Sequence, residues 1–209
     1  MASFYNDKLA FIHVPKTGGS WVMQALSAAG VPFKTMGEGA ASHVAWNDMP
    51  RRPFTFGFVR EPATWYRSYW SYVRKAEEVS DNALDRLVVE SRDFPEFVER
   101  VCSELRGSVS NMYDHYFGPP GAIDFIGHYE SLEDDLLKAL ATAGQPVDAQ
   151  AIRNCKPFNV STEKPELTPR LRALIADAER PAMERFGYDL DSSHGVTGAR
   201  RSPSGSPSS

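Results

Sequence analysis

The feature that most constrains the fold is a repeated order of apolar strand, polar loop and helix. Residues 9–14, LAFIHV, are an apolar run of strand length that ends at Pro15, and a helical pattern, SWVMQALSAAG, follows. A second copy begins at residues 53–59, PFTFGFV; the tripeptide REP comes next, and a helix is expected over residues 63–78 because proline suits a first helical turn. Such repeats build parallel sheets covered by helices.

A third strand is predicted at residues 122–129, AIDFIGHY, and a helix at residues 132–144. Residues 82–105 carry apolar side chains at helical spacing, and a last helix is expected over residues 168–179. Pro181 should kink or end that helix. The sequence therefore predicts an α/β fold, a single domain with a P-loop-like parallel sheet flanked by helices on both faces.

Composition limits the class of protein. A chain of 209 residues with 42% apolar and 24% charged residues suits one globular domain, and residues 191–209, rich in Gly, Ser and Pro, are expected to be a disordered tail. No long apolar run or secretory leader is recognisable, so we expect no membrane span and a cytoplasmic protein. Cys102 and Cys155 are interpreted as free thiols. The net charge of −4 argues against nucleic-acid partners, so any anion site must be local.

The loop after the first strand, PKTGGSW, looks like a phosphate loop with its lysine misplaced. In an ATP-type P-loop the lysine follows the glycines, whereas Lys16 precedes Gly18 and Gly19. The glycines let backbone approach an anion, and the amides of Gly19, Ser20 and Trp21 should open a helix with free N–H groups. The alternative is that Thr-Gly-Gly is only a tight turn.

The loop after the second strand begins with Arg60. An arginine leaving a buried strand needs an anionic partner, and its planar fork suits phosphate. Ser68 lies about two helical turns further and can donate to the same anion. The alternative is an Arg60 that pairs with a carboxylate at the edge of the core. Because ligands of open α/β sheets bind beyond the carboxyl ends of the strands, both loops are expected to face one pocket.

Taken together, HVPKTGGSW, FVREPATWYRSYW and FIGHYESLEDDL resemble the sulfotransferases that use 3′-phosphoadenosine 5′-phosphosulfate, in particular the branch that sulfates carbohydrates and its bacterial relatives. The late segments FNVSTEKP and RFGY also match, so the resemblance covers most of the chain in separated blocks. It implies a sulfotransferase domain over residues 1–190, with 3′-phosphoadenosine 5′-phosphosulfate as co-substrate and no metal. It implies a sugar or small-molecule acceptor with a free hydroxyl, and it sets no oligomeric state.

The resemblance also implies roles for individual residues. Arg60 and Ser68 match the pair that binds the 3′-phosphate. Asn159, Ser161 and Lys164 match a late block that folds over the nucleotide, whereas a polar loop of this composition can equally be only a turn. The residues implied for the 5′-phosphosulfate are Lys16, Thr17, Gly18, Gly19, Ser20 and Trp21.

The expected catalytic residues are Lys16 and His43. His43 lies where the family branch often has a histidine opening a short H-A-T-A-like motif, of which HVAW keeps the first and third positions. A neutral imidazole can take the acceptor proton, and Lys16 would stabilise charge on the oxygen that leaves. His13, inside the first strand, is interpreted as a packed neighbour. Glu130 also matches the family but is interpreted as a structural tie or helix cap.

Two other functions stay open. A P-loop small-molecule kinase is disfavoured by the position of the lysine and by the lack of acidic magnesium ligands after a strand. A noncatalytic nucleotide-binding relative would keep the phosphate loops and lose the acceptor chemistry. Arg67 could assist a phosphate or face water. The aromatic side chains of the second helix are Trp65, Tyr66, Tyr69, Trp70 and Tyr72. We interpret them mainly as core, with one or two of them forming the floor of an acceptor or adenine site.

Overall fold

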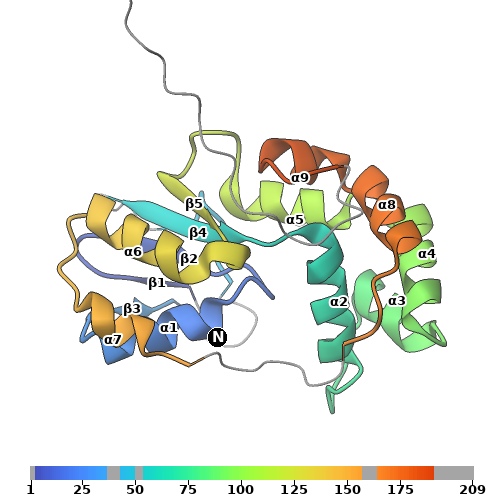
Figure 1. Cartoon of the computed structure of the whole chain (residues 1–209), viewed down its shortest axis with the longest axis horizontal. Coiled ribbons are helices and arrows are strands. Elements are labelled where there is room, and N and C mark those ends of the chain that lie inside the picture. Colours follow the sequence, from blue (N-terminus) through green and yellow to red (C-terminus); the bar gives the residue numbers. More distant parts are fainter. Residues whose placement is uncertain (1–2, 37–42, 50–53, 157–163, 191–209) are drawn as a thin grey trace, which may run out of the picture.

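A computed structural model of the chain describes residues 3–36, 43–49, 54–156 and 164–190. Over these residues the chain is a single-domain α/β fold with a five-stranded mixed sheet and nine α-helices (Figure 1). The expected tail, residues 191–209, lies outside the described residues. No helix in the described part is long and apolar enough to cross a membrane.

One side of the sheet consists of three parallel strands, which are the three that the apolar runs predict. They are β2 (Ala10–Ile12), β4 (Thr55–Val59) and β5 (Phe125–His128), and the strand order is β3-β1-β2-β4-β5. Phe56 stands opposite both Phe11 on β2 and Phe125 on β5. The parallel register brings the carboxyl ends of all three strands, and the loops that follow them, to one edge of the sheet.

The prediction of a wholly parallel sheet is wrong at one side. The strand β1 (Phe4–Tyr5) pairs antiparallel with β2, and β3 (Lys34–Thr35) pairs antiparallel with β1. The link from β1 to β2 is too short for the crossover of a dozen or more residues that parallel strands need. Asn6 turns the chain back within it, because its Oδ1 accepts hydrogen bonds from the amides of Lys8 and Leu9.

Each face of the sheet has its own hydrophobic core, because successive side chains of a strand point to opposite faces. One core joins Phe11, Phe56 and Phe58 to the helices α1 (Gly19–Ala28), α6 (Leu132–Thr142) and α7 (Ala149–Arg153). The other joins Ala10 and Ile12 to the remaining six helices of the described part (Figure 1), which are α2 (Pro62–Val73), α3 (Ala83–Glu90), α4 (Phe94–Glu104), α5 (Ser108–Phe117), α8 (Pro169–Ala178) and α9 (Arg180–Arg185). The expectation of helices on both faces is confirmed.

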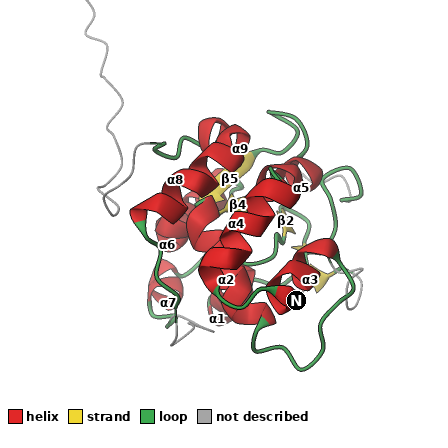
Figure 2. Ribbon diagram, turned by 90° about the vertical axis from the view of Figure 1, so that its right-hand side faces the viewer, coloured by secondary structure: helices red, strands yellow, loops and turns green. Residues whose placement is uncertain are grey.

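The helix boundaries differ from the predicted ones where side chains stop being buried. The helix α2 ends at Val73, before the exposed KAEE segment that the prediction included. Residues 82–105 form two helices, and α8 packs against α4 and α2 (Figure 2). Pro181 ends α8 as expected and stands in the first turn of α9. The expectation that both cysteines are free thiols is confirmed, and burial raises the pKa of Cys102 to about 12.

Candidate functional site

A cleft of about 1380 Å³ opens at the carboxyl ends of β2, β4 and β5. Its walls are the loops that follow these strands, the segment at His43 and one side of α2. The cleft brings together most of the residues that the sequence predicts for a site, namely Lys16, Gly18, Gly19, Ser20, Trp21, His43, Arg60, Ser68 and Lys164. Within the predicted set, Asn159 and Ser161 lie outside the described residues.

The loop between β2 and α1 is held tightly by its neighbours. Lys16 and Gly18 adopt left-handed backbone conformations, with φ of 65° and 89°. A Cβ atom on Gly19 would lie 2.0 Å from the ring of His13, so no larger residue fits there. Thr17 differs from the prediction, because its buried hydroxyl donates to the carbonyl of Val14 at 2.9 Å and it does not line the cleft. Its role is to brace the turn.

The N-terminus of α1 faces the cleft without a side-chain cap. Gly18 occupies the N-cap position, and the first turn contains no acidic residue. Trp21 corrects the prediction of three free amides, because its backbone N–H donates to the Gly18 carbonyl at 2.9 Å and its indole N–H to the Cys155 carbonyl at 3.2 Å. Among the described residues, the amides of Gly19 and Ser20 have no acceptor. Two N–H groups and the helix dipole therefore favour an anion here.

Lys16 places a cation beside this helix end. Its Nζ lies 4.1 Å from the centre of the Tyr72 ring. Burial, and after it the charge of Arg60, lowers the pKa of Lys16 to about 8. In the described part of the chain, no carboxylate lies within ion-pair distance of its ammonium group. Its charge is therefore not neutralised by any described residue.

Arg60 ties the second loop to the first. Its Nη1 donates to the carbonyl oxygen of Lys16 at 3.1 Å, and its Nε donates to the hydroxyl of Thr64 at 3.1 Å. The guanidinium carbon lies 4.1 Å from the centre of the Tyr129 ring. The alternative of a carboxylate partner at the core edge finds no support, since no described carboxylate forms an ion pair with Arg60. Two cations without a described carboxylate partner thus face one cleft.

The cleft side of α2 is polar. Thr64, Ser68 and Ser71 line it at helical spacing, which places them on one side of the helix. Arg67 also lines the cleft, and its pKa is lowered by burial first and then by the charges of Arg172 and Arg60. Arg60 and Arg67 bring two guanidinium groups to the cleft, whose lining also includes the carboxylates of Glu130, Glu133 and Asp134.

The ring of His43 is held by a hydrogen bond to the backbone of His13. Its Nδ1 lies 2.9 Å from the carbonyl oxygen of His13, and the two imidazole centres are 4.8 Å apart. A carbonyl oxygen only accepts hydrogen bonds, so Nδ1 carries the proton of a neutral His43. The lone pair of that ring is then on Nε2, on a side chain that lines the cleft. His13 is buried, as expected for a packed neighbour.

Glu130 acts as the structural tie that the sequence suggests. One carboxylate oxygen accepts the backbone N–H of Glu61 at 3.0 Å, and the other accepts the Tyr188 hydroxyl at 3.2 Å. Burial, and after it the charge of Glu130, raises the pKa of Tyr188. These bonds join the start of α2 to the segment after β5 and to the chain that follows α9. Glu130 thereby orients the loop that carries Arg60.

The sequence assigns no individual site role to three tyrosines that lie around the two cations. Tyr129 directly follows β5, at the edge of the sheet where the loops meet, so its position in the sequence could have indicated a site residue. Tyr72 follows Ser68 by four residues, and the sequence marks it only as one member of an aromatic helix. Tyr113 lies on α5, a helix that no pattern predicted, and nothing local marks it.

No family model, curated protein or solved structure matches this chain. The charges and hydrogen-bonding groups of the cleft are therefore what indicate its ligand.

Proposed function

We propose that this chain is a sulfotransferase that moves a sulfuryl group from 3′-phosphoadenosine 5′-phosphosulfate to a hydroxyl of a carbohydrate or of a small glycosylated or secondary metabolite. One observation carries the proposal: Lys16 and Arg60, neither with a described carboxylate partner, lie in one cleft with the uncapped start of α1. A ligand with two anionic ends fits this arrangement, since charged hydrogen bonds to phosphate are the strong ones.

The residues present fit such a donor. The start of α1, with the free amides of Gly19 and Ser20 and the ammonium of Lys16, suits the 5′-phosphosulfate. Arg60 and Ser68 suit the 3′-phosphate on the wall formed by α2. In this proposal β2, its loop and α1 are a P-loop-like unit whose lysine precedes the glycines, which suits a sulfated nucleotide.

The size of the cleft supports a reaction between two substrates. Sites for one drug-sized ligand enclose roughly 300 to 1,000 Å³. The cleft measures about 1380 Å³, which leaves room beside a nucleotide for an acceptor. The acceptor hydroxyl would enter between Lys16 and His43.

The proposed chemistry is an in-line displacement at sulfur. His43 takes the acceptor proton on Nε2 while its Nδ1–H stays bonded to the His13 carbonyl. The acceptor oxygen forms the new bond to sulfur as the bond between sulfur and the bridging oxygen breaks. Lys16 stabilises the negative charge that develops on that oxygen. The products are a sulfate ester and adenosine 3′,5′-bisphosphate.

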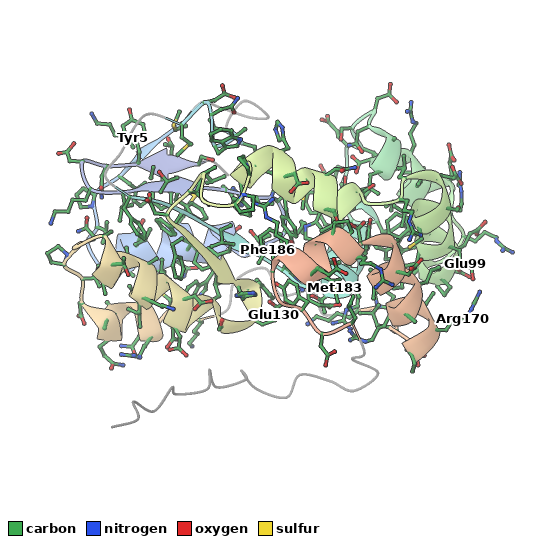
Figure 3. All side chains as sticks on the ribbon, turned by 90° about the horizontal axis from the view of Figure 1, so that it is seen from above. Tyr5, Glu99, Glu130, Arg170, Met183 and Phe186 are labelled. Atoms are coloured by element: carbon green, nitrogen blue, oxygen red, sulfur yellow. The ribbon has the colours of Figure 1, made fainter. Side chains whose placement is uncertain are left out.

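Calorimetric titration tests the donor assignment. Adenosine 3′,5′-bisphosphate should bind the wild type and lose about ten- to a hundredfold in affinity in Arg60→Ala, because a charged contact to phosphate is removed. The matched control is Arg170→Ala: Arg170 pairs with Glu99 at the outer edge of the helical layer (Figure 3), away from the cleft.

Three outcomes would overturn the proposal. A preference for ATP with magnesium would favour a kinase, and equal affinity in Arg60→Ala and wild type would remove Arg60 as the ligand of the 3′-phosphate. Bisphosphate binding with no sulfuryl transfer to any of a broad panel of hydroxyl acceptors would favour a noncatalytic nucleotide-binding protein.

A further inference from the structure

Two of the cations that line the cleft, Lys16 and Arg60, each lie over a tyrosine ring. Lys16 Nζ and Arg60 Cζ both lie 4.1 Å from a ring centre, that of Tyr72 and that of Tyr129. An aromatic face attracts a cation through its quadrupole yet carries no net charge. A carboxylate in the same place would neutralise the cation and compete with an anionic ligand. The rings hold the cations and leave their charge available.

Lys16 depends on its ring more than Arg60 does. The guanidinium of Arg60 is also fixed by hydrogen bonds to Thr64 and to the Lys16 carbonyl. The backbone of Lys16 is set by its left-handed conformation and by that same bond. Its ammonium stands at the end of a flexible four-carbon stem. Within the described residues, the Tyr72 ring is the contact that locates it.

Packing gives no other reason for the position of Tyr72. Its exposed fraction is 57%, whereas Trp65 and Tyr66 on the same helix are 2% and 1% exposed. The interpretation of this aromatic helix as mainly core, with one or two side chains left for a site, holds for Trp65, Tyr66 and Trp70, which are buried. Tyr72 is an exception of the kind that the interpretation allowed. Four residues after Ser68, it lies on the side of α2 that lines the cleft.

We propose that Tyr72 is a positioning residue of the anion site, whose ring holds the Lys16 ammonium in the cleft without neutralising it. The proposal rests on the proposed function for the identity of the anion, and on the Tyr72–Lys16 contact for everything else. It assigns to Tyr72 no contact with the reacting atoms.

The contact can be tested without any nucleotide. In lysine-labelled protein, the Lys16 methylene protons next to the ammonium should resonate upfield, because the nitrogen that they adjoin lies over the face of the Tyr72 ring. The Lys16→Arg variant lacks this lysine, so the signal that disappears from its spectrum is that of Lys16. We expect the upfield shift in wild type and in Tyr72→Phe, which keeps the ring, and its loss in Tyr72→Leu. A wild-type signal at the ordinary lysine position would overturn the proposal.

The functional consequence is tested by titration of adenosine 3′,5′-bisphosphate. Affinity should be about two- to fivefold weaker in Tyr72→Leu, the scale of one partly exposed cation–π contact, and unchanged in Tyr72→Phe. In a Lys16→Met background, Tyr72→Leu should have no further effect, since the ring then has no cation to hold.

The outcomes separate this proposal from the proposed function. An effect of Tyr72→Leu that persists in the Lys16→Met background, or tighter binding in Tyr72→Leu, would overturn the positioning role. If the wild type does not bind the bisphosphate, the donor assignment fails, and the resonance of Lys16 still decides whether Tyr72 positions it.

Discussion

The hydroxyl of Tyr113 bonds both backbone polar groups of Arg60: it donates to the carbonyl oxygen at 2.7 Å and accepts from the amide at 2.8 Å. Tyr113 is fully buried on α5, and burial raises its pKa, so the hydroxyl keeps its proton. One side chain thereby fixes the peptide units on either side of Arg60, at the point where β4 ends and α2 begins.

Tyr113→Phe should destabilise the protein and weaken the anion site together. The variant leaves the Arg60 amide and carbonyl without their partner, at a cost of about 1 to 3 kcal/mol in the free energy of unfolding. Denaturant unfolding measures that cost, and titration should show weaker bisphosphate binding at a temperature where the variant is folded. Loss of stability with unchanged affinity would show that Tyr113 does not orient Arg60.

The Lys16 ammonium predicts how anion binding depends on pH. Its pKa is lowered to about 8, so the charged fraction falls as the pH rises through that value. A bound anion favours the charged form, and binding must then take up a proton. Bisphosphate affinity should be nearly constant from about pH 6.5 to 7.5 and fall by up to about tenfold per pH unit above about pH 8.

Lys16→Arg is the control for this profile, because a guanidinium stays charged over the whole range. The variant should lose the decline between about pH 8 and 9.5, whatever its absolute affinity. A wild-type profile that stays flat to the alkaline end of that range would contradict the assignment of Lys16 to the anion.

His43→Gln should separate chemistry from binding. Removal of a general base typically costs about 10²- to 10⁴-fold in rate, so turnover should fall by about that factor. Bisphosphate affinity should stay within about twofold of wild type, because His43 is assigned to the acceptor proton. His115→Gln is the matched control, since His115 is exposed on α5 and does not line the cleft. Wild-type turnover in His43→Gln would remove His43 as the base.

Glu179 should be a main support of the helical layer. Its side chain has an exposed fraction of 0%, and it accepts hydrogen bonds from the Tyr66 hydroxyl and from the amides of Val109 and Ser110. The charge of Glu179 adds to burial in raising the pKa of Tyr66. Glu179→Ala leaves these buried donors unpaired, and we expect a loss of about 3 to 5 kcal/mol in the free energy of unfolding.

The control for Glu179→Ala is a second acid near the same helix junction. Asp177→Ala removes a carboxylate whose ion pairs with Arg106 and Arg180 are on the surface. That variant should lose less than about 1 kcal/mol. Chemical denaturation of both variants checks the contrast. Equal losses would mean that the buried hydrogen bonds of Glu179 contribute no more than a surface ion pair.

The sequence by itself determined the three parallel strands and which residues the two loops after β2 and β4 carry. Three apolar runs, each followed by turn residues and a helical pattern, specify β2, β4 and β5 locally, since a buried strand is recognisable from its own residues. The parallel order of those strands then places Lys16 and Arg60 at one edge. The sequence marked Gly18 and Gly19 as a turn or a place of close backbone approach, and the structure shows a left-handed Gly18 and a Gly19 packed against His13.

Only the tertiary structure decided what surrounds these loops. The strands β1 and β3 are two residues each, too short to carry a pattern; β1 pairs with the edge of β2, and β3 pairs with β1. Tyr113 lies 53 residues from the Arg60 peptide that it holds. Tyr72 is exposed on α2 although Trp65, Tyr66 and Trp70 of the same helix are buried, and its ring contacts Lys16 in the loop after β2. Such contacts join residues far apart in the chain, so their energy depends on the folded arrangement and leaves no local pattern.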